Sequence, residues 1–312
     1  MKKILDYYNT HLSLWVVIFA AVAYFFPEVF TGVKSSINLF FAVTMFGIGL
    51  VITEEDYRNI ARSPRQILLG NLFQFTIMPL MALVTAHLFS LSDTLTVGLI
   101  LTGSAPGAMT SNVISYLSGG DVAYSVSLTA VATILCPVLT PLLTWLLAGH
   151  MVPIPFLSMF LTIMYTVVAP LILGFCVRKI MPSLISRIDG IPAAISVTSI
   201  IIITSYVVAA NRGNLGKATL LIFAAIIFHN LAGMLLGYLG GQAAGFSFKR
   251  KKTLSIEIGM QNAGLGVILA LEHFSAEVAI PAAIFTIWCI VSASMLVNFW
   301  GVLEKRSARI LN

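Results

Sequence analysis

The feature that most constrains the fold is a series of ten long apolar stretches separated by short polar segments. They run approximately over residues 13–31, 36–53, 66–90, 95–118, 121–148, 154–177, 188–210, 217–243, 253–275 and 278–303. An α-helix needs about 20 residues to cross a bilayer, whereas a barrel strand needs about 10 with alternating polarity. The pattern therefore predicts an all-α membrane protein with ten transmembrane helices.

The amino-acid composition agrees with this prediction and excludes other classes of protein. Of the 312 residues, 58% are hydrophobic and 10% are charged, whereas soluble domains carry about 25% charged residues. A soluble enzyme and a disordered chain are therefore excluded. The net charge of +6 comes from basic residues spread over short segments rather than one continuous face, so no nucleic acid is expected as a partner. Cys136, Cys176 and Cys289 lie inside apolar stretches, which indicates small core residues rather than a disulfide framework.

Lysine and arginine residues set the expected orientation, because they concentrate in cytoplasmic segments. With ten spans, both termini lie on the same side, and most of the 18 Lys and Arg residues fall on that side. They are Lys2, Lys3, Arg58, Arg62, Arg65, Arg178, Lys179, Arg187, Lys249, Arg250, Lys251, Lys252, Lys305, Arg306 and Arg309. Lys34, Arg212 and Lys217 fall on the other side. Both termini are therefore expected in the cytoplasm. The first stretch lacks a small-residue cleavage site, so we expect a retained span rather than a signal peptide.

One polar segment, Thr53 to Gln66, carries apolar residues at helical spacing. It is compatible with a short interfacial helix on the cytoplasmic face and equally with an ordinary loop.

A weak internal repeat divides the chain into residues 1–156 and 157–312. The segments 113–117 (VISYL) and 267–271 (VILAL) correspond, and so do 121–123 (DVA) and 277–279 (EVA). Each half then holds five spans, and because five is odd the two halves enter the membrane from opposite sides. Many secondary transporters have this inverted architecture, with substrate and ion sites near the midplane at broken helices.

Two apolar stretches contain an interruption at corresponding positions. In the fourth stretch it is 103–112 (GSAPGAMTSN), and in the ninth it is 257–264 (EIGMQNAG). Pro106 removes a helix hydrogen bond, and the glycines permit dihedral angles outside the helical range. Unpaired carbonyls at membrane depth are tolerated only where they are buried or line a cavity. Both interruptions are therefore predicted to be breaks at a binding site.

Glu257 is the acid that falls well inside an apolar stretch. A lone charge at that depth costs roughly 2.5–3.5 kcal/mol on insertion scales, and no Lys or Arg is assigned to a span. Glu257 is therefore either protonated or bound to a diffusible cation, and the nearby oxygen donors favour a hard ion such as Na⁺. The alternative is a surface acid that reaches the cytoplasmic face. Ser125 and Thr129 share a helix face four residues apart, and Gln74 and the pair His229-Asn230 are further candidates for polar contacts.

The run 257–262 (EIGMQN) resembles the E-x-G-M-Q-N signature of the bile acid:sodium symporter family, whose bacterial members are homologues of the apical sodium-dependent bile-acid transporter. Pro106-Gly107, Ser111-Asn112-Val113, Gln74-Phe75 and the spaced Ser125 and Thr129 are similar to the same family. The resemblance covers the length of the chain. It implies a bacterial inner-membrane carrier in which spans 1, 2, 6 and 7 form a panel domain. Spans 3–5 and 8–10 would form a core domain, with spans 4 and 9 crossing.

The resemblance also implies two sodium ions behind the crossing and an organic anion in front of it. The residues implied for the first ion are Ser111, Asn112, Ser125, Thr129 and Glu257. Those implied for the second are Gln74, Glu257 and Gln261 with the carbonyls of Ile258 and Met260. Pro106, Thr110, Asn112, Asn262 and Cys289 would face the substrate.

One departure concerns the substrate. Bacterial members of the family carry a His-Asn pair after the tryptophan of the tenth span, whereas Trp288 is followed here by Cys289-Ile290. A smaller organic anion, such as a pantoate-like hydroxy acid, is therefore at least as plausible as a bile acid.

The rival functions are a related inverted-repeat carrier that uses protons or works in the outward direction, a channel, and an intramembrane enzyme. An enzyme is the weakest of these, because the chain lacks paired acids or a nucleophile–base constellation at depth.

Overall fold

The computed structural model describes residues 5, 7–9, 12–51, 63–188 and 190–310. Within these ranges the secondary structure is helical, apart from one isolated bridge between Gly107 and Gln261. The first part of the chain forms α2 Leu12–Phe25, α3 Glu28–Thr31, the 3₁₀ turn η1 Lys34–Ser36, α4 Ile37–Gly49, α6 Pro64–Leu88, α7 Asp93–Gly103, α8 Thr110–Leu117 and α9 Val122–Ala148. The second part forms α10 Phe156–Ile163, the π segment η2 Met164–Val168, α11 Ala169–Ile180, α12 Pro182–Arg187, α13 Ile191–Ala210, α14 Arg212–Ala243, α15 Phe248–Gly259, α16 Ala263–His273 and α17 Ile280–Ile310.

Six of the described helical segments are long and apolar enough to cross a membrane. They are Pro64–Leu88, Val122–Ala148, Phe156–Ile180, Ile191–Ala210, Leu220–Ala243 and Ile280–Val297. The protein is therefore an all-α membrane protein, as the sequence predicts. The other four apolar stretches yield shorter helices, because the fourth and ninth are broken and the first is interrupted at Pro27. The second stretch gives α4, after which residues 52–62, and with them most of the expected interfacial helix, lie outside the described residues.

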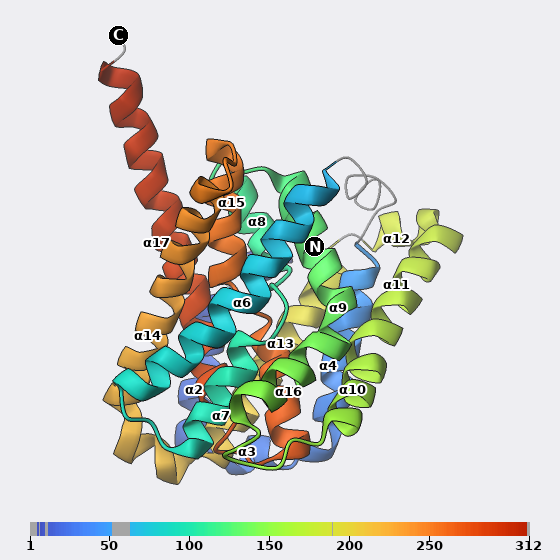
Figure 1. Cartoon of the computed structure of the whole chain (residues 1–312). Helices are drawn as coiled ribbons and strands as arrows, with labels where there is room; N and C mark the ends of the chain where they lie inside the picture. The colour runs from blue at the N-terminus through green and yellow to red at the C-terminus, as the bar shows by residue number, and fades with distance from the viewer. Residues whose placement is uncertain (1–4, 6, 10–11, 52–62, 189, 311–312) are drawn as a thin grey trace.

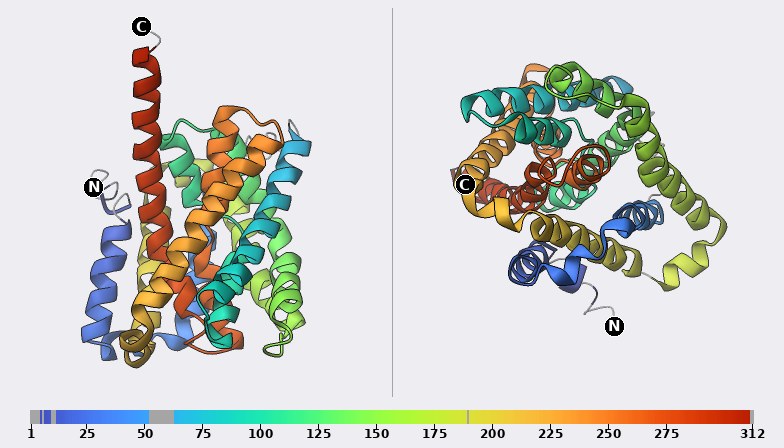
Figure 2. Two further views of the ribbon diagram at one scale, coloured as in Figure 1. Left: turned by 60° about the vertical axis from the view of Figure 1, so that its left-hand side comes forward. Right: turned by 90° about the horizontal axis from the view of Figure 1, so that it is seen from below.

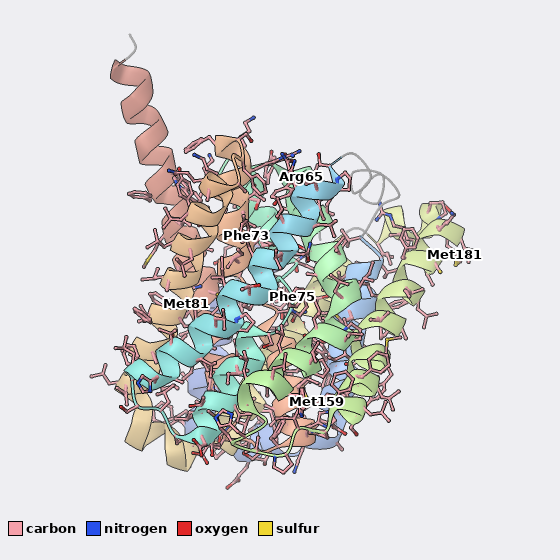
Figure 3. The ribbon with its side chains drawn as sticks, viewed as in Figure 1. Arg65, Phe73, Phe75, Met81, Met159 and Met181 are labelled. Carbon is pink, nitrogen blue, oxygen red and sulfur yellow. The ribbon has the colours of Figure 1, made fainter. Side chains whose placement is uncertain are left out.

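The helices pack with an apolar exterior and a partly polar interior, as α6 illustrates (Figure 3). On its outer side Leu68, Leu72 and Leu80 are exposed, whereas Asn71 and Gln74 are buried. Figure 3 shows α6 running from Arg65 near one end of the bundle past Phe73 and Phe75 to Met81. Since lipid is as apolar as a leucine side chain, such an outer face suits a bilayer, and the buried amide N–H groups donate hydrogen bonds inside the bundle.

The basic starts of α6 and α15 lie at one end of the bundle (Figures 1 and 2). α12, the starts of α6 and α15 and the far end of α17 lie there, and α3 lies at the opposite end. The described basic residues at the starts of α6 and α15 therefore share an end, as the charge pattern predicts. They lie in helices rather than loops, because α15 already begins at Phe248.

Both predicted breaks are present, and they meet. Residues 104–109 separate α7 from α8, and residues 260–262 separate α15 from α16. The Ala108 N–H donates to the Met260 carbonyl at 2.7 Å, and the Asn262 N–H donates to the Pro106 carbonyl at 2.8 Å. These two bonds join the breaks and satisfy four of their backbone groups at depth.

The half-helices on the two sides of the breaks have different surroundings. α16 packs against α7 and α17 and also against α4, α10 and α13. Three hydrogen bonds lie around its far end: Asn38 Nδ2 to Glu272 Oε2 at 2.9 Å, Thr162 Oγ1 with His273 Nε2 at 2.9 Å, and Asn211 Nδ2 to the Ala276 carbonyl at 2.8 Å. α8 packs on α9 and α15 and shares α17 with α16, and its Tyr116 remains 71% exposed.

Candidate functional site

Glu257 lies in the last turn of α15, directly before the second break, and is only 2% exposed. Its Oε2 accepts hydrogen bonds from Ser111 Oγ at 2.5 Å and Ser125 Oγ at 3.1 Å. Its Oε1 accepts a hydrogen bond from Thr129 Oγ1. The alternative of a surface acid is therefore excluded. Hydroxyl groups from two other helices enclose the carboxylate.

The enclosing hydroxyls come from positions that the sequence singles out. Ser125 and Thr129 lie one turn apart on α9, so both face α15. Ser111 lies in the first turn of α8, and the neighbouring Asn112 brings its Oδ1 to 3.5 Å from Thr129 Oγ1. The structure thus brings together all five residues expected around the first ion. It adds Ser115, whose Oγ donates to Ser125 Oγ at 3.2 Å, a residue that the sequence analysis missed.

The backbone of the first break approaches the Glu257 carboxylate closely at Gly107. A Cβ built on Gly107 would lie 2.3 Å from Glu257 Oε1, closer than any real contact. From its place in the sequence, Gly107 is expected to help break the helix. The structure shows that it also gives room to the carboxylate.

The residues expected around the second ion also lie together. Gln74 Nε2 donates to Gln261 Oε1 at 2.8 Å and lies 3.4 Å from the Ala105 carbonyl. Gln261 Nε2 donates to the Ile258 carbonyl at 2.8 Å, and the Met260 carbonyl accepts from Ala108. Gln74 Oε1 is buried and has no hydrogen-bond partner among the described residues. A buried acceptor without a donor is costly, and it suits a cation.

The chemistry of these donors favours an alkali ion over a transition metal. Within the described ranges, no three His, Cys, Asp or Glu side chains gather in a group that could hold a metal. The donors around Glu257 are hydroxyl, amide and carbonyl oxygens, which suit hard cations. The ion pair found in the described part of the chain, Arg250 with Asp121 at 2.8 Å, does not involve Glu257. The carboxylate therefore has no protein counter-charge there.

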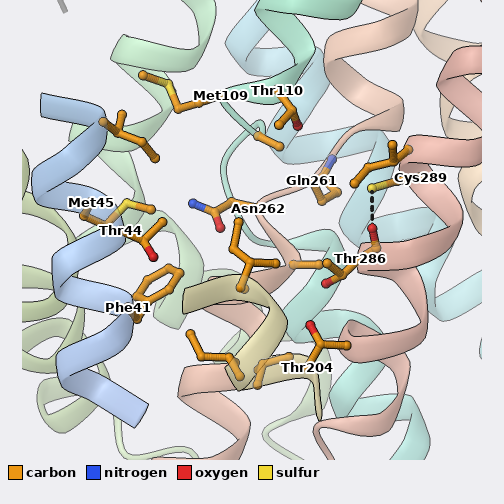
Figure 4. A pocket seen from close by; sticks show the side chains of 18 residues that line it. Phe41, Thr44, Met45, Met109, Thr110, Thr204, Gln261, Asn262, Thr286 and Cys289 are labelled. Atoms are coloured by element: carbon orange, nitrogen blue, oxygen red, sulfur yellow. Dashed lines mark hydrogen bonds between the residues drawn. The ribbon is translucent and has the colours of Figure 1, made fainter. Parts of the chain in front are cut away.

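A cavity that is partly open to the outside lies beside the crossing (Figure 4). Of the residues expected to face substrate, Thr110, Asn262 and Cys289 line it. Pro106 and Asn112 are not among its lining residues: Pro106 is buried in the crossing, and Asn112 lies beside Thr129.

The rest of the cavity wall was not anticipated. Residues of α4, α13 and α17 form this part of the wall. They include Thr44, Thr204 and Thr286, which Figure 4 labels. These threonines sit in apolar stretches whose sequences give no local sign of a cavity. Only the packing of α4 and α13 beside the crossing brings them there.

The burial of Lys252 is not apparent from the sequence. Its Nζ donates to the Ser118 carbonyl at 2.6 Å and lies 5.0 Å from the centre of the Phe248 ring. Although it belongs to the basic run 249–252, it is only 1% exposed. Lys252 joins the end of α8 to the start of α15.

An all-helical membrane protein with two broken helices, meeting beside a buried carboxylate and an adjoining cavity, has the construction of a secondary transporter. The chain belongs to the Sodium Bile acid symporter family, whose family model matches residues 38–218.

Relatives match over nearly the whole chain. An "Uncharacterized sodium-dependent transporter", YocS, of Bacillus subtilis (strain 168) is 38% identical over 306 residues, covering 98% of this chain and 95% of the relative. The "Probable sodium/metabolite cotransporter BASS1, chloroplastic" of Arabidopsis thaliana is 30% identical over 305 residues, covering 96% and 74%. The corresponding BASS2 protein of Oryza sativa subsp. japonica is 32% identical over 306 residues, covering 96% and 72%. The chain is thus a transport protein of a sodium-dependent family and not an enzyme.

Proposed function

We propose that this protein is a symporter that uses two sodium ions to import an organic anion by alternating access. The observation that carries the proposal is the environment of Glu257: a buried carboxylate, enclosed by three hydroxyls, with no ion pair in the described part of the chain. A buried ionised carboxylate needs a compensating cation. A cation taken from solution would supply it and would couple ion binding to the crossing.

The first sodium ion would bind among Ser111, Asn112, Ser125, Thr129 and Glu257. Ser111, Ser125 and Thr129 now donate their protons to the carboxylate. A hydroxyl also has two lone pairs, so rotating each proton away would present three oxygens to an ion. The amide oxygen of Asn112 and the carboxylate would complete an oxygen shell from three different helical segments.

The second ion would bind among Gln74, Glu257, Gln261 and the carbonyls of Ile258 and Met260. The support is Gln74 Oε1, which lacks a partner among the described residues. Two sodium ions beside one carboxylate leave about one net positive charge. The N-termini of α8 and α16, which begin at Thr110 and Ala263, add partial positive charge at the same place. An anion in the adjoining cavity would therefore be attracted only when the ions are bound.

The substrate would occupy the cavity beside the crossing, in contact with Thr110, Asn262 and Cys289. Pro106 and Asn112 would then act from behind the cavity wall by shaping the crossing and the first ion site. Cys289 is an uncharged, small residue at this wall. We infer a metabolite with a carboxylate, either a bile acid or a smaller pantoate-like acid, and relatives named sodium/metabolite cotransporters support the broader class.

Transport would proceed by movement of a core domain, spans 3–5 and 8–10, against a panel domain, spans 1, 2, 6 and 7. The corresponding breaks in residues 1–156 and 157–312 support two inverted repeats of five spans each. The gathering of basic segments at one end supports cytoplasmic termini in a bacterial inner membrane, with lipid around the apolar exterior. The sodium gradient and the membrane potential would then drive uptake.

Thermal unfolding in Na⁺ and in K⁺ at equal ionic strength and fixed pH tests the proposal. An ion that binds only the folded state stabilises it by about 2.7 kcal/mol at one hundred times its dissociation constant. We expect selective stabilisation of the wild type by Na⁺, its loss in Glu257→Gln, and its retention in Glu272→Gln, because Glu272 lies at the far end of α16. Equal stability of the wild type in Na⁺ and K⁺ would refute sodium coupling, and stabilisation by protons instead would indicate a proton-coupled carrier.

A further inference from the structure

The carbonyl groups of the two breaks have lost their helical partners, so each needs a donor from elsewhere. At the first break, Thr140 Oγ1 donates to the Ser104 carbonyl at 2.7 Å, and Gln74 Nε2 lies 3.4 Å from the Ala105 carbonyl. Side chains of α9 and α6 thus hold the backbone of the break from outside it.

At the second break, three successive carbonyls have different partners. The Ile258 carbonyl accepts from Gln261 Nε2, and the Met260 carbonyl accepts from the Ala108 N–H. The carbonyl between them, that of Gly259, accepts from Asn230 Nδ2 at 2.7 Å. Asn230 belongs to α14 and is fully buried. It is therefore the side chain of another helix that fixes the central peptide of this break.

The approach of α14 to this point depends on Gly259. A Cβ on Gly259 would lie 2.2 Å from Met234 Cγ, one turn further along α14. Because glycine stands there, α14 can lie against the last turn of α15, and the short Asn230 side chain reaches the carbonyl. The arrangement resembles the first break, where Gln74 reaches across from α6.

We propose that Asn230 is a positioning residue for sodium binding: by holding the Gly259 carbonyl toward α14, it sets the orientation of the neighbouring Ile258 and Met260 carbonyls and of the turn that carries Glu257. The inference rests on the proposed sodium sites and extends them to a residue outside the ion shell. Adjacent peptide planes share a Cα atom, so turning one carbonyl reorients its neighbours. Residues that hold ligands in place commonly affect metal affinity by about 10- to 100-fold.

Asn230 has a second polar atom that points to a different role. Its Oδ1 is buried and has no partner among the described residues, so this oxygen could itself contact a cation. The two roles make opposite predictions for Asn230→Asp. A residue that acts through its N–H loses its donor in the aspartate, whereas a residue that acts through oxygen gains a stronger ligand.

The test is direct binding of ²²Na⁺ to the purified full-length protein, together with its melting temperature without sodium. The variants are Asn230→Leu and Asn230→Asp, and the matched control is Asn71→Leu. Asn71 is also buried and also has an unpartnered Oδ1, but its Nδ2 donates to Ile67 of its own helix at 3.0 Å. The control therefore removes a similar amide without touching either break.

We expect both Asn230 variants to raise the dissociation constant for sodium about 10-fold or more, while Asn71→Leu leaves it within about twofold of the wild type. The number of ions bound at saturating sodium should stay unchanged. A merely structural role would instead lower the melting temperature or the bound fraction and leave the dissociation constant as it is in the wild type. Unchanged affinity in Asn230→Leu, or tighter binding in Asn230→Asp, would overturn the proposal. No sodium binding by the wild type would instead refute the proposed function.

Discussion

Replacing Gly107 by alanine is the sharpest test of how the crossing holds the ion site. The added Cβ would lie 2.3 Å from Glu257 Oε1, and real Cβ contacts essentially never fall below 3.0 Å. The carboxylate or the backbone of the first break must therefore move by at least 0.7 Å. Neither can move freely, because Thr129 holds the same Oε1 and the break is bonded to Met260 and Asn262.

The displacement can be converted into an expected loss of affinity. Hydrogen bonds to a charged group contribute about 1.5–3 kcal/mol, and each 1.4 kcal/mol corresponds to a tenfold change in a dissociation constant. If the shift costs one such contact, or one equivalent ligand contact to the ion, Gly107→Ala should weaken sodium binding by roughly 10- to 100-fold. The double variant Gly107→Ala/Glu257→Asp, whose carboxylate is one methylene shorter, should recover part of that loss.

The assay is a ²²Na⁺ titration of the purified protein, with Gly213→Ala as the control. Nothing lies within 4 Å of a Cβ built on Gly213, so that variant should bind sodium like the wild type. A folded Gly107→Ala protein with wild-type sodium affinity would refute the reasoning, since it would mean that the carboxylate does not need the space beside Gly107.

Three further predictions separate the ion site, the cavity and the end of the bundle. Thr129→Val removes a hydroxyl that contacts Glu257 and should weaken sodium binding about 10-fold in the same titration. The control is Thr133→Val, one turn away, whose hydroxyl donates to the Thr129 carbonyl at 2.7 Å. Its sodium affinity should stay near that of the wild type. Cys289→Phe adds a ring to the cavity wall; in proteoliposomes it should reduce sodium-driven anion uptake at least about 10-fold, while sodium-dependent thermal stabilisation persists, and loss of both would contradict the separation of the two sites. Asp121→Asn removes an ion pair whose side chains are 24% and 26% exposed; it should lower stability by no more than about 1 kcal/mol without changing sodium affinity, and a large change in affinity would link this end of the bundle to the ion site.

The broken helices could be predicted because their causes are local. Pro106 removes a hydrogen bond from its own helix. Gly107 and Gly259 are not among the glycines with a positive φ, and they serve the crossing by allowing close approach. The expected group around Glu257 also depends on short-range rules: Ser125 and Thr129 share a face because they are one helical turn apart. Their meeting with Glu257 followed from the resemblance of the motif, not from spacing.

The parts that the sequence did not predict depend on contacts between distant segments. Thr44 and Thr204 line the cavity only because α4 and α13 pack beside the crossing. Lys252 looks in the sequence like Lys249 to Lys251, none of which is buried, yet the carbonyl of Ser118 and the ring of Phe248 cover it. The contact of Asn230 with Gly259 depends on a glycine on one helix meeting an amide on another, a match that periodicity cannot reveal.

The hydrogen bonds that join Asn38, Thr162 and Asn211 to the far end of α16 have a consequence for the working cycle. Each contributes about 0.5–1.5 kcal/mol net, so opening that end would cost about 1.5–4.5 kcal/mol together. Under the proposed orientation that end faces outward, so these contacts alone would favour the inward-open state of the ion-free protein by about 10- to 1,600-fold. Sodium must then bind the outward-open state more tightly by at least that factor for loading to occur. The ion-free carrier would thus rest in the inward-open state, and the external sodium concentration would determine how often the outward-open state binds substrate.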